Sequence, residues 1–455
     1  MLKMAHVFAR FMMLCTLVFS HPLIAATWTI NSSSELAAKL LTANAGDTLT
    51  LLPAHYLGQF EINKALTLTG HEGAIIDAQG SGCAIKIAAN NVTIDGLIIQ
   101  NWGADLYERN AGILIDENTA NIAIKHNQLH GDGFGIRADH SQALTISHNH
   151  ISGNSQLHIL DRGDGIYLNR VEQALIEFNH IKQVRDGVYI ESSKGSLVTN
   201  NRFYQQQYGI HYMYSENDEA YGNYSQDVSG GFAIMSSKSV YLHHNWAQNA
   251  TEYGVLLNIT NGARIEYNVL HNIHNPQGDA TLGNEGRAIF IYGALDNEIH
   301  GNEFARSDIG IAMAMGGEKN RIYGNNFIDN LIQVKYVGDE LLQWSQQGRG
   351  NYWSGYMGWD HGQDGIGDQR YQPNDSMDKL FWRYPEAKFL MNSPIVSLLR
   401  WVESQLAVLS ATGIYDDFPL MQPITVENVS NPLFDDVVHH QPNTDLIAKS
   451  EFADE

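Results

Sequence analysis

One histidine and two methionines of this sequence form a candidate copper(I) site. His211 and Met213 alternate with apolar residues in the run Gly209-Ile-His-Tyr-Met213, and Met235 holds the matching place in the run Gly231-Phe-Ala-Ile-Met235. Thioether sulfur and imidazole nitrogen are soft ligands that suit Cu(I), so the three side chains could hold copper for transfer. In the alternative interpretation a C-terminal segment covers this strip and the methionines only pack beneath it.

Three aspartates nearer the C-terminus suggest a calcium loop. Asp360, Asp364 and Asp368 are interspersed with glycines at positions 362, 365 and 367, and alternate oxygens in a tight loop can wrap a hard cation. The spacing departs from the standard twelve-residue loop, and Gln363 stands where a carboxylate would help. A structural Ca²⁺ and a metal-free Asp/Gly-rich turn therefore both remain open.

Histidines also recur at a regular interval along the chain. We expect them to be solvent-exposed turn residues, because some stacking of abundant histidines arises by chance. They are His126, His148, His150, His180, His243 and His244.

A rival chemistry is the cleavage or epimerisation of acidic polysaccharides, which needs paired carboxylates, or a base with a neutralising cation, on one outward strip. The outward positions of the Gly-aliphatic runs carry carboxylates only singly, as in Asp139 and Glu191. An acidic chain would also repel an anionic polymer. We therefore expect no enzyme activity and keep a secreted polysaccharide lyase, epimerase or hydrolase as the alternative.

The elements that position these residues are coils of a repeat. Asparagines close short β-runs every 22 or 23 residues, with two longer intervals of 30 and 34, and glycines or alanine open the opposite runs at nearly the same intervals. Two ladders with one period and shared interruptions indicate a solenoid of about ten coils. The asparagines are Asn127, Asn149, Asn179, Asn201, Asn223, Asn245, Asn268, Asn302 and Asn325; the other ladder is Gly112, Gly135, Gly165, Gly187, Gly209, Gly231, Gly254, Ala288 and Gly310.

Each run alternates apolar and variable residues, which is the period of a β-strand with one face in a core. Val188 and Ile190 are one expected inward pair. We expect the corner glycines and asparagines to supply the positive φ of tight turns. The sequence thus predicts an all-β fold, a parallel β-helix over residues 27–338, with loops near 155–162 and 275–286.

Both ends of the solenoid have candidate caps. Ser32 and Glu35 fit a capping box, and Leu36, Leu40 and Leu41 suggest an apolar stripe, so a short N-terminal helix should plug the first coil. Residues 339–421 form a Trp-rich C-terminal extension with an amphipathic helix over 394–409. We expect this helix either to seal the last coil or to bind a partner. The tryptophans expected at the partner surface are Trp353, Trp359, Trp382 and Trp401.

The N-terminus indicates export. Lys3 and Arg10 precede an apolar stretch over 11–19, which is typical of a secretory signal peptide over residues 1–26. The remaining chain, from Thr27, carries one cysteine, Cys83, which we expect to be buried and inert. Residues 422–455 are acidic and aperiodic and are predicted to be a disordered tail.

Charge restricts the partners. The formal net charge is −22, and it becomes −24 once Lys3 and Arg10 leave with the signal. A field of this sign repels polyphosphate, so nucleic acid is excluded as a partner.

Several segments resemble one family. They are Gly209-Ile-His-Tyr-Met-Tyr-Ser215, Gln333-Val-Lys-Tyr-Val-Gly338, the block Gly348-Arg-Gly-Asn-Tyr-Trp-Ser-Gly-Tyr-Met-Gly-Trp-Asp360, Asp364-Gly-Ile-Gly-Asp368, Trp382-Arg-Tyr-Pro385 and Met391-Asn-Ser-Pro394. The resemblance is to the NosD family, periplasmic β-helix proteins needed to mature nitrous-oxide reductase, and it extends from about residue 40 to Met421.

The resemblance implies a right-handed, pectin-lyase-like coil and a non-enzymatic accessory role in the periplasm. It further implies work beside an ABC transporter made of the ATPase NosF and the permease NosY. Finally, it implies contacts with the copper chaperone NosL and with the reductase, whose copper-sulfide centre is built in the periplasm. Copper would then be a transient cargo.

Overall fold

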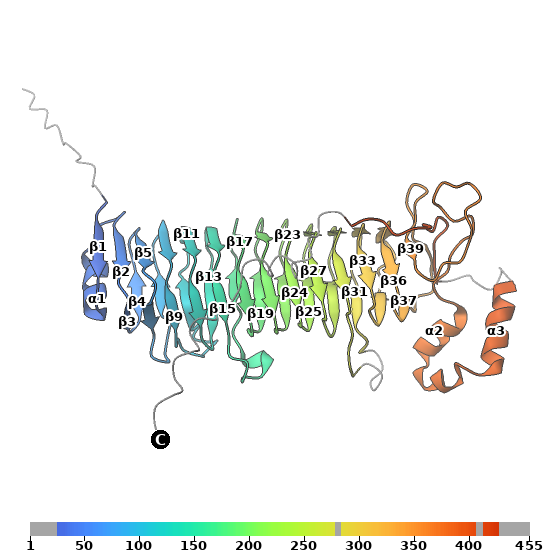
Figure 1. Ribbon diagram of the computed structural model, residues 1–455, viewed down its shortest axis with the longest axis horizontal. Helices are drawn as coiled ribbons and strands as arrows, with labels where there is room; N and C mark the ends of the chain where they lie inside the picture. Colours follow the sequence, from blue (N-terminus) through green and yellow to red (C-terminus); the bar gives the residue numbers. More distant parts are fainter. Residues whose placement is uncertain (1–24, 278–283, 406–412, 427–455) are drawn as a thin grey trace, which may run out of the picture.

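The chain winds into one long parallel β-helix (Figure 1). The computed structural model describes residues 25–277, 284–405 and 413–426. Residues 1–24 of the predicted signal peptide (1–26) and residues 427–455 of the predicted tail (422–455) lie outside this part. The prediction of disorder is wrong for the start of the tail, because Ile424 is hydrogen-bonded to Asn326. The β-helix prediction is confirmed, but the expected ten coils are too few, since two of the sheets have 13 strands and the third has 12.

Three sheets, here named A, B and C, run the length of the molecule (Figure 1). Sheet A contains β1 (Thr27–Ile30), β2 (Thr48–Leu51), β5 (Thr67–Gly70), β8 (Val92–Asp95), β11 (Ala120–Lys125), β14 (Gln142–Ser147), β17 (Leu175–Glu177), β20 (Leu197–Thr199), β23 (Glu219–Tyr221), β26 (Tyr241–His243), β29 (Arg264–Glu266), β32 (Glu298–His300) and β35 (Arg321–Tyr323).

Sheet B contains β3 (Ala54–Leu57), β6 (Ala74–Asp77), β9 (Ile98–Gln100), β12 (Gln128–His130), β15 (His150–Ser152), β18 (His180–Lys182), β21 (Arg202–Tyr204), β24 (Tyr224–Gln226), β27 (Trp246–Gln248), β30 (Val269–His271), β33 (Glu303–Ala305), β36 (Asn326–Ile328) and β39 (Tyr352–Trp353). Because β39 pairs with β36, the ladder of sheet B continues past residue 338.

Sheet C has the longest strands. It contains β4 (Phe60–Ile62), β7 (Ile85–Ile87), β10 (Ala111–Ile115), β13 (Phe134–Asp139), β16 (Ile166–Asn169), β19 (Asp186–Glu191), β22 (Tyr208–Met213), β25 (Gly230–Met235), β28 (Tyr253–Asn258), β31 (Arg287–Tyr292), β34 (Ile309–Ala314) and β37 (Ile332–Tyr336). Val188 and Ile190 are fully buried, as their alternation predicts.

The glycine and asparagine ladders are needed for reasons other than positive φ. A Cβ on Gly187 would lie 2.6 Å from the carbonyl oxygen of Gly209, so the coils approach too closely for a side chain there. Asn245 is fully buried, whereas the left-handed corner is the residue before it, His244, at φ 53°. The prediction that ladder residues supply the positive φ is therefore wrong for these positions.

The buried asparagines supply hydrogen bonds to the backbone groups at the corner between sheets A and B. The side-chain Nδ2 of Asn245 donates to the carbonyl oxygens of Ala220 and His243, both at 2.9 Å, and to Oδ1 of Asn268 at 3.0 Å. A buried backbone group without a partner would cost free energy, so each asparagine stabilises two coils at once. In the coil that precedes Asn127, the equivalent corner position is occupied by Leu97 instead of asparagine. The asparagine pattern therefore misses the first coils.

The N-terminal end is closed by α1 (Ser33–Thr42). Ser32 caps the helix by accepting from the backbone N–H of Glu35 at 3.3 Å. Leu36 and Leu40 are buried against the first coil, whereas Leu41 is 73% exposed because it lies outside the stripe that residues four apart form.

The C-terminal end of the core is closed by tryptophans rather than by a helix. Trp353 is 1% exposed and stacks on Phe327 with ring centroids 4.2 Å apart, and Trp344 is 2% exposed. Asp416 fixes this closure, because its Oδ2 accepts from the backbone N–H of Asn351 at 2.7 Å and from Nε1 of Trp353 at 2.9 Å. It follows the short strand β40 (Gly413–Tyr415), which pairs with β38 (Leu341–Gln343). The prediction that Trp353 faces a partner is therefore wrong.

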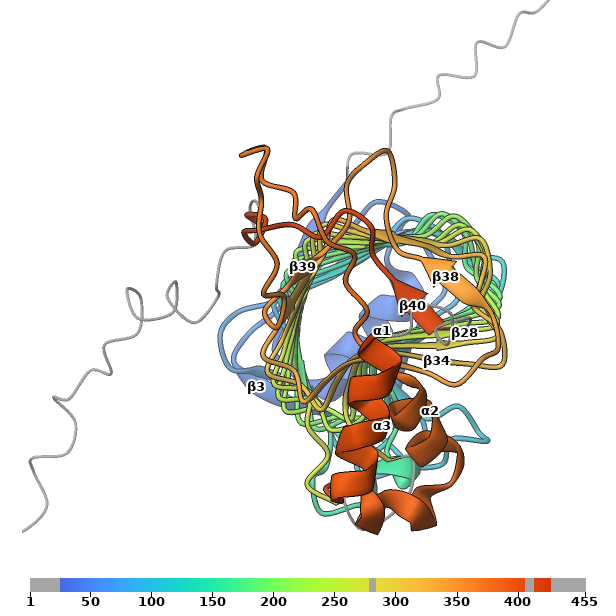
Figure 2. The same cartoon turned by 90° about the vertical axis from the view of Figure 1, so that its right-hand side faces the viewer.

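A helical unit projects beyond the last coil (Figures 1 and 2). It contains α2 (Ser376–Arg383), the 3₁₀ helix η2 (Pro385–Leu390) and α3 (Pro394–Gln405). The predicted helix end at 406–409 lies outside the described residues. No described helix is long and apolar enough to cross a membrane.

Two smaller features complete the fold. The inserted loop near 155–162 contains the 3₁₀ helix η1 (Ile159–Asp161). Cys83 is half-buried rather than buried, because it precedes strand β7, and burial raises the pKa of its thiol.

Candidate functional site

The candidate site lies on the outer face of sheet C, where β19, β22 and β25 run side by side. The register places His211 between Tyr189 and Ala233, and it places Met213 directly beside Met235. Neighbouring strands are about 4.8 Å apart, so the two thioether side chains start from adjacent backbone positions. The structure thus brings together the methionine pair, with His211 two residues away on the same face.

His211 is held firmly by its neighbours. Its Nδ1 lies 3.0 Å from Oδ2 of Asp186, and its ring stacks on Tyr189 with centroids 4.5 Å apart. The residue is only 9% exposed. Nε2 has no hydrogen-bond partner among the described residues. With the proton on Nδ1 donated to the carboxylate, Nε2, which is itself buried, carries a lone pair, and a carboxylate on the other ring nitrogen is the arrangement that orients histidine for a metal.

A second buried carboxylate, that of Asp164, lies near the Asp186–His211 pair. Arg185 donates to both oxygens of Asp164, at 2.9 and 2.8 Å, and lies 3.9 Å from Asp186. Burial, together with the charge of Asp186, raises the pKa of Asp164 to about 7. Sequence reasoning missed these residues, although the signal was present: an aspartate precedes the ladder glycine in two consecutive coils, at Asp164 and Asp186.

Met235 belongs to a small apolar cluster on the outside of the helix. Among the described residues the cluster consists of side chains of neighbouring coils, which are Tyr208, Ala233, Leu256, Met235, Tyr253 and Phe290. None of the described C-terminal residues belongs to it. Both methionines are half-buried.

The carboxylates on the same face are already engaged. Asp139 accepts from Nε of Arg137 at 2.9 Å and from Nδ2 of Asn169 at 3.0 Å. Glu191 accepts from the hydroxyl of Tyr167 at 2.5 Å. Neither is a freely placed acid or base of the kind that polysaccharide cleavage needs.

The aspartates of the candidate calcium loop turn toward backbone amides. Oδ2 of Asp360 accepts from the N–H of Gly365 at 2.8 Å, and Oδ2 of Asp368 accepts from the N–H of His361 at 2.6 Å. Within the described ranges no group of three histidine, cysteine or acidic side chains is arranged to hold a metal. This geometry favours the metal-free turn.

The recurrent histidines stack between coils, and the expectation of solvent-exposed turns holds for His126 and His148, which are exposed corner residues at φ 54° and 56°. His148 lies between His126 and Phe178, at 5.1 and 5.0 Å. The His243 side chain is only 13% exposed, and its Nε2 lies 2.9 Å from Oε1 of Glu219. The expectation is wrong for His243 because ring stacking between coils removes it from water.

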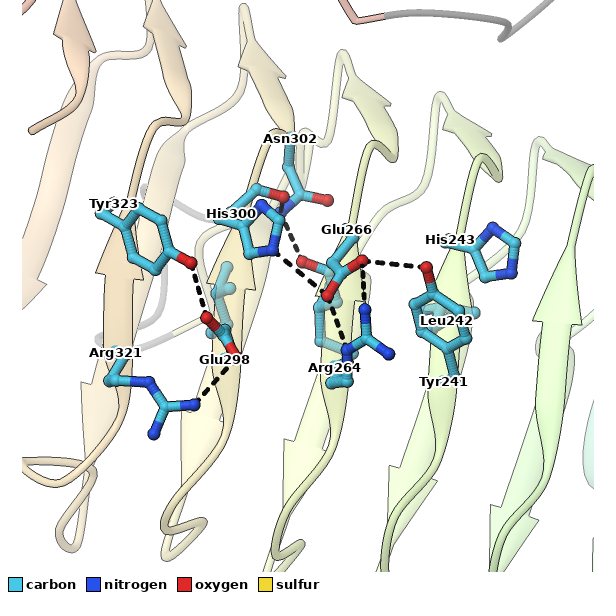
Figure 3. Close-up of polar contacts among 12 residues, drawn as sticks. Tyr241, Leu242, His243, Arg264, Glu266, Glu298, His300, Asn302, Arg321 and Tyr323 are labelled. Carbon is cyan, nitrogen blue, oxygen red and sulfur yellow. Dashed lines mark hydrogen bonds and ion pairs between the residues drawn. The ribbon is translucent and has the colours of Figure 1, made fainter. Parts of the chain in front are cut away.

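Further along sheet A the polar groups saturate one another (Figure 3). Glu266 accepts from the Tyr241 hydroxyl at 2.9 Å, from Arg264 at 2.7 and 2.9 Å, and lies 3.2 Å from Nε2 of His300. Every donor around Glu266 is engaged, so this network stabilises the coils.

These features define a parallel β-helix protein that carries one oriented imidazole beside a thioether pair on its outer face. The fold is similar to that of the A-modules of the mannuronan C-5 epimerases AlgE4 and AlgE6 of Azotobacter vinelandii. Their TM-scores are 0.57 and 0.55 at 16% identity, covering 70% and 67% of this chain and 99% and 92% of those chains. This likeness shows the fold alone.

The family follows from closer relatives. Residues 147–358 match the family model described as "Periplasmic copper-binding protein (NosD)". Proteins named "Probable ABC transporter binding protein NosD" are 41% identical, in Stutzerimonas stutzeri over 83% of this chain and 87% of the relative, and in Pseudomonas aeruginosa over 84% and 90%. The chain therefore belongs to the NosD family.

Proposed function

We propose that this protein acts in the periplasm as a copper-handling accessory factor for nitrous-oxide reductase. In this proposal it receives Cu(I) from the chaperone NosL, works beside the transporter formed by NosF and NosY, and supports assembly of the reductase copper centre. The family description as periplasmic and copper-binding supports the location and the cargo. The name of the relatives as ABC transporter binding proteins supports the transporter partner.

The observation that carries the proposal is the oriented His211 beside the methionine pair. Asp186 fixes Nδ1 of His211, and the remaining ring nitrogen and the sulfur atoms of Met213 and Met235 are soft donors. Three neutral ligands add no anionic charge, so binding should be weak and reversible, as a transfer site requires.

The direct test is a Cu(I) titration against a colorimetric chelator. The variant with His211→Ala, Met213→Leu and Met235→Leu should lose this copper, while leucine preserves the volume of the apolar cluster. Unchanged Cu(I) affinity would leave packing as the role of the methionines. In cells, deletion of the protein should leave the reductase without its complete copper centre, and a normally assembled centre would refute the maturation role.

The helical unit is the proposed surface for the membrane partner. Ile395, Leu398 and Leu399 of α3 are 70%, 58% and 46% exposed. Trp359 and Trp401 are 58% and 61% exposed, and Trp382 is half-buried. Since the core is already closed by Trp344 and Trp353, this apolar face is available to a protein partner. The candidate docking residues are therefore Trp359, Trp382, Trp401 and the exposed face of α3.

A further inference from the structure

A groove lies at the corner between sheets A and B, away from the copper candidate, and encloses about 430 Å³. Its floor is formed by Gly301 and Gly324 on consecutive coils. His300 and Tyr323 form one wall, and the chain segment at Ile424 forms the other.

The groove exists because two corner side chains are missing. The same corner position carries a side chain at His244 and Tyr267, with φ of 53° at both. At Gly301 a Cβ would lie 2.7 Å from the Tyr267 ring, so that ring lies across the glycine. At Gly324 a Cβ would meet nothing within 4 Å, and the floor is therefore open there.

The opposite wall is fastened to the coils. Asn326 clamps Ile424, because its Oδ1 accepts from the Ile424 N–H at 2.8 Å and its Nδ2 donates to the Ile424 carbonyl at 2.9 Å. A paired amide contact of this kind holds the backbone as a β-ladder would. The groove is thus a built feature with two fixed sides.

Aromatic surface lines the first wall. The rings of His300 and Tyr323 stack with centroids 5.1 Å apart and planes 22° apart. Their polar atoms face acids of sheet A: Nε2 of His300 lies 3.2 Å from Glu266, and the Tyr323 hydroxyl donates to Glu298 at 2.5 Å (Figure 3). What remains for a ligand is therefore mainly ring surface.

One cation stands at the end of this wall. The register of Asn326 with Tyr352 places Arg349 one coil beyond Tyr323 in the same row. Its guanidinium has no hydrogen bond or ion pair within the described chain, and no acidic residue lines the groove. That is unusual in a chain with 50 acidic and 28 basic residues. Arg349 also borders a hollow that contains Asp360 and Asp364.

We propose that this groove binds a small organic anion with a flat unsaturated body. Its carboxylate pairs with Arg349, and its body lies over Gly324 against the ring of Tyr323. Guanidinium pairs with carboxylate in a planar geometry, and flat rings stack at offset contact distance. The inference is independent of copper handling, because no residue of the His211 strip takes part.

The test measures binding of benzoate to the full-length protein by calorimetry, with benzylamine as the probe of the same shape and opposite charge. We expect benzoate to bind and benzylamine not to bind. Arg349→Gln should weaken benzoate binding about tenfold, as loss of a charged hydrogen-bonded contact does. Equal binding of the two probes, or no benzoate binding, would overturn the proposal.

The floor provides a second, independent variant. Gly324→Asn fills the groove and tolerates its φ of 60°, because asparagine adopts the left-handed conformation. The matched control is Gly195→Asn, at φ 66° and also with open space at its Cβ. We expect the first to abolish benzoate binding and the second to leave it unchanged. If Arg349→Gln weakens binding and Gly324→Asn does not, the anion sits in the hollow near Asp360, and the groove proposal is wrong.

Discussion

Asp186 and His211 lie on adjacent coils of sheet C, with Oδ2 of the aspartate 3.0 Å from Nδ1 of the histidine. Asp186 is 3% exposed and His211 is 9% exposed. A buried contact of this kind sets which ring nitrogen carries the proton, and so it decides whether His211 can act as a ligand.

Replacing Asp186 should therefore weaken copper binding without touching a ligand. We expect Asp186→Asn to lower Cu(I) affinity about 10- to 100-fold, the range for loss of a supporting carboxylate. The control is Asp139→Asn, a carboxylate on the same face that pairs with Arg137. Equal affinities for Asp186→Asn and the unaltered protein would show that His211 does not bind copper.

The asparagine ladder gives a stability prediction. Asn245→Leu keeps the branching and the number of side-chain heavy atoms but removes three donated hydrogen bonds, and it leaves the backbone N–H of Asn223 without its acceptor. We expect a loss of at least about 3 kcal/mol, seen as a lower melting temperature by circular dichroism. Asn249→Gly, at an exposed corner with φ 56°, should change stability by less than about 0.5 kcal/mol.

Asp218 makes stability depend on pH. Burial raises the pKa of this carboxyl from 3.8 to about 7, so the folded protein keeps a proton that the unfolded chain has lost. The free energy of unfolding should then fall as pH rises from about 4 to 7, by up to about 4 kcal/mol.

Asp218→Asn should make this fall smaller and stabilise the protein at pH 8, while Asp164, whose pKa burial also raises to about 7, still contributes. Asparagine suits the corner, because Asn297 accepts the equivalent backbone N–H at 2.8 Å where Asp218 accepts at 2.7 Å. Thermal melts from pH 4 to pH 8 provide the measurement, with the half-exposed Asp116→Asn as control. Parallel curves for Asp218→Asn and the unaltered protein would contradict the assignment.

The docking surface can be tested by point variants. Truncation after Trp382 would also remove Asp416, which closes the core, so it cannot separate docking from folding. Changing Ile395, Leu398 and Leu399 to serine should leave the melting temperature unchanged and reduce co-purification with the transporter at least tenfold. The matched control is Leu41→Ser, which changes an exposed leucine of α1 at the other end of the solenoid. Retained co-purification would place the transporter contact elsewhere.

Polysaccharide chemistry provides a final check. The purified protein should release no unsaturated ends from pectate or alginate, because Asp139 and Glu191 are held by donors. Release of such ends would favour the enzyme alternative.

Periodicity predicted the coils well wherever a local pattern repeats. Ladder asparagines such as Asn223 mark each coil because every coil needs the same corner hydrogen bonds. The first coils were not predicted, because residues such as Leu97 occupy the corner position in place of asparagine. The pattern gave the methionine pair as well, since strand alternation and a constant period fix which residues are neighbours.

Contacts between distant segments could not be predicted in the same way. Trp353 was expected at a partner surface, but it is buried because Asp416, 63 residues later, receives its indole N–H. His211 was recognised by its place in a strand, whereas its partner Asp186 was missed, because an aspartate before the ladder glycine in two coils does not by itself show which side chain it contacts. Long-range closure depends on how the chain returns, which spacing alone does not contain.

Because the ladder of sheet B is uninterrupted, the length of the rod can change only in steps of one coil. Thirteen stacked strands at about 4.8 Å give a rod of about 58 Å, and each further coil would lengthen it by one fixed step. The strand register continues across both insertions, so they add no length to the rod. The distance along the solenoid axis between the His211 strip and the helical unit is therefore set by the number of coils between them.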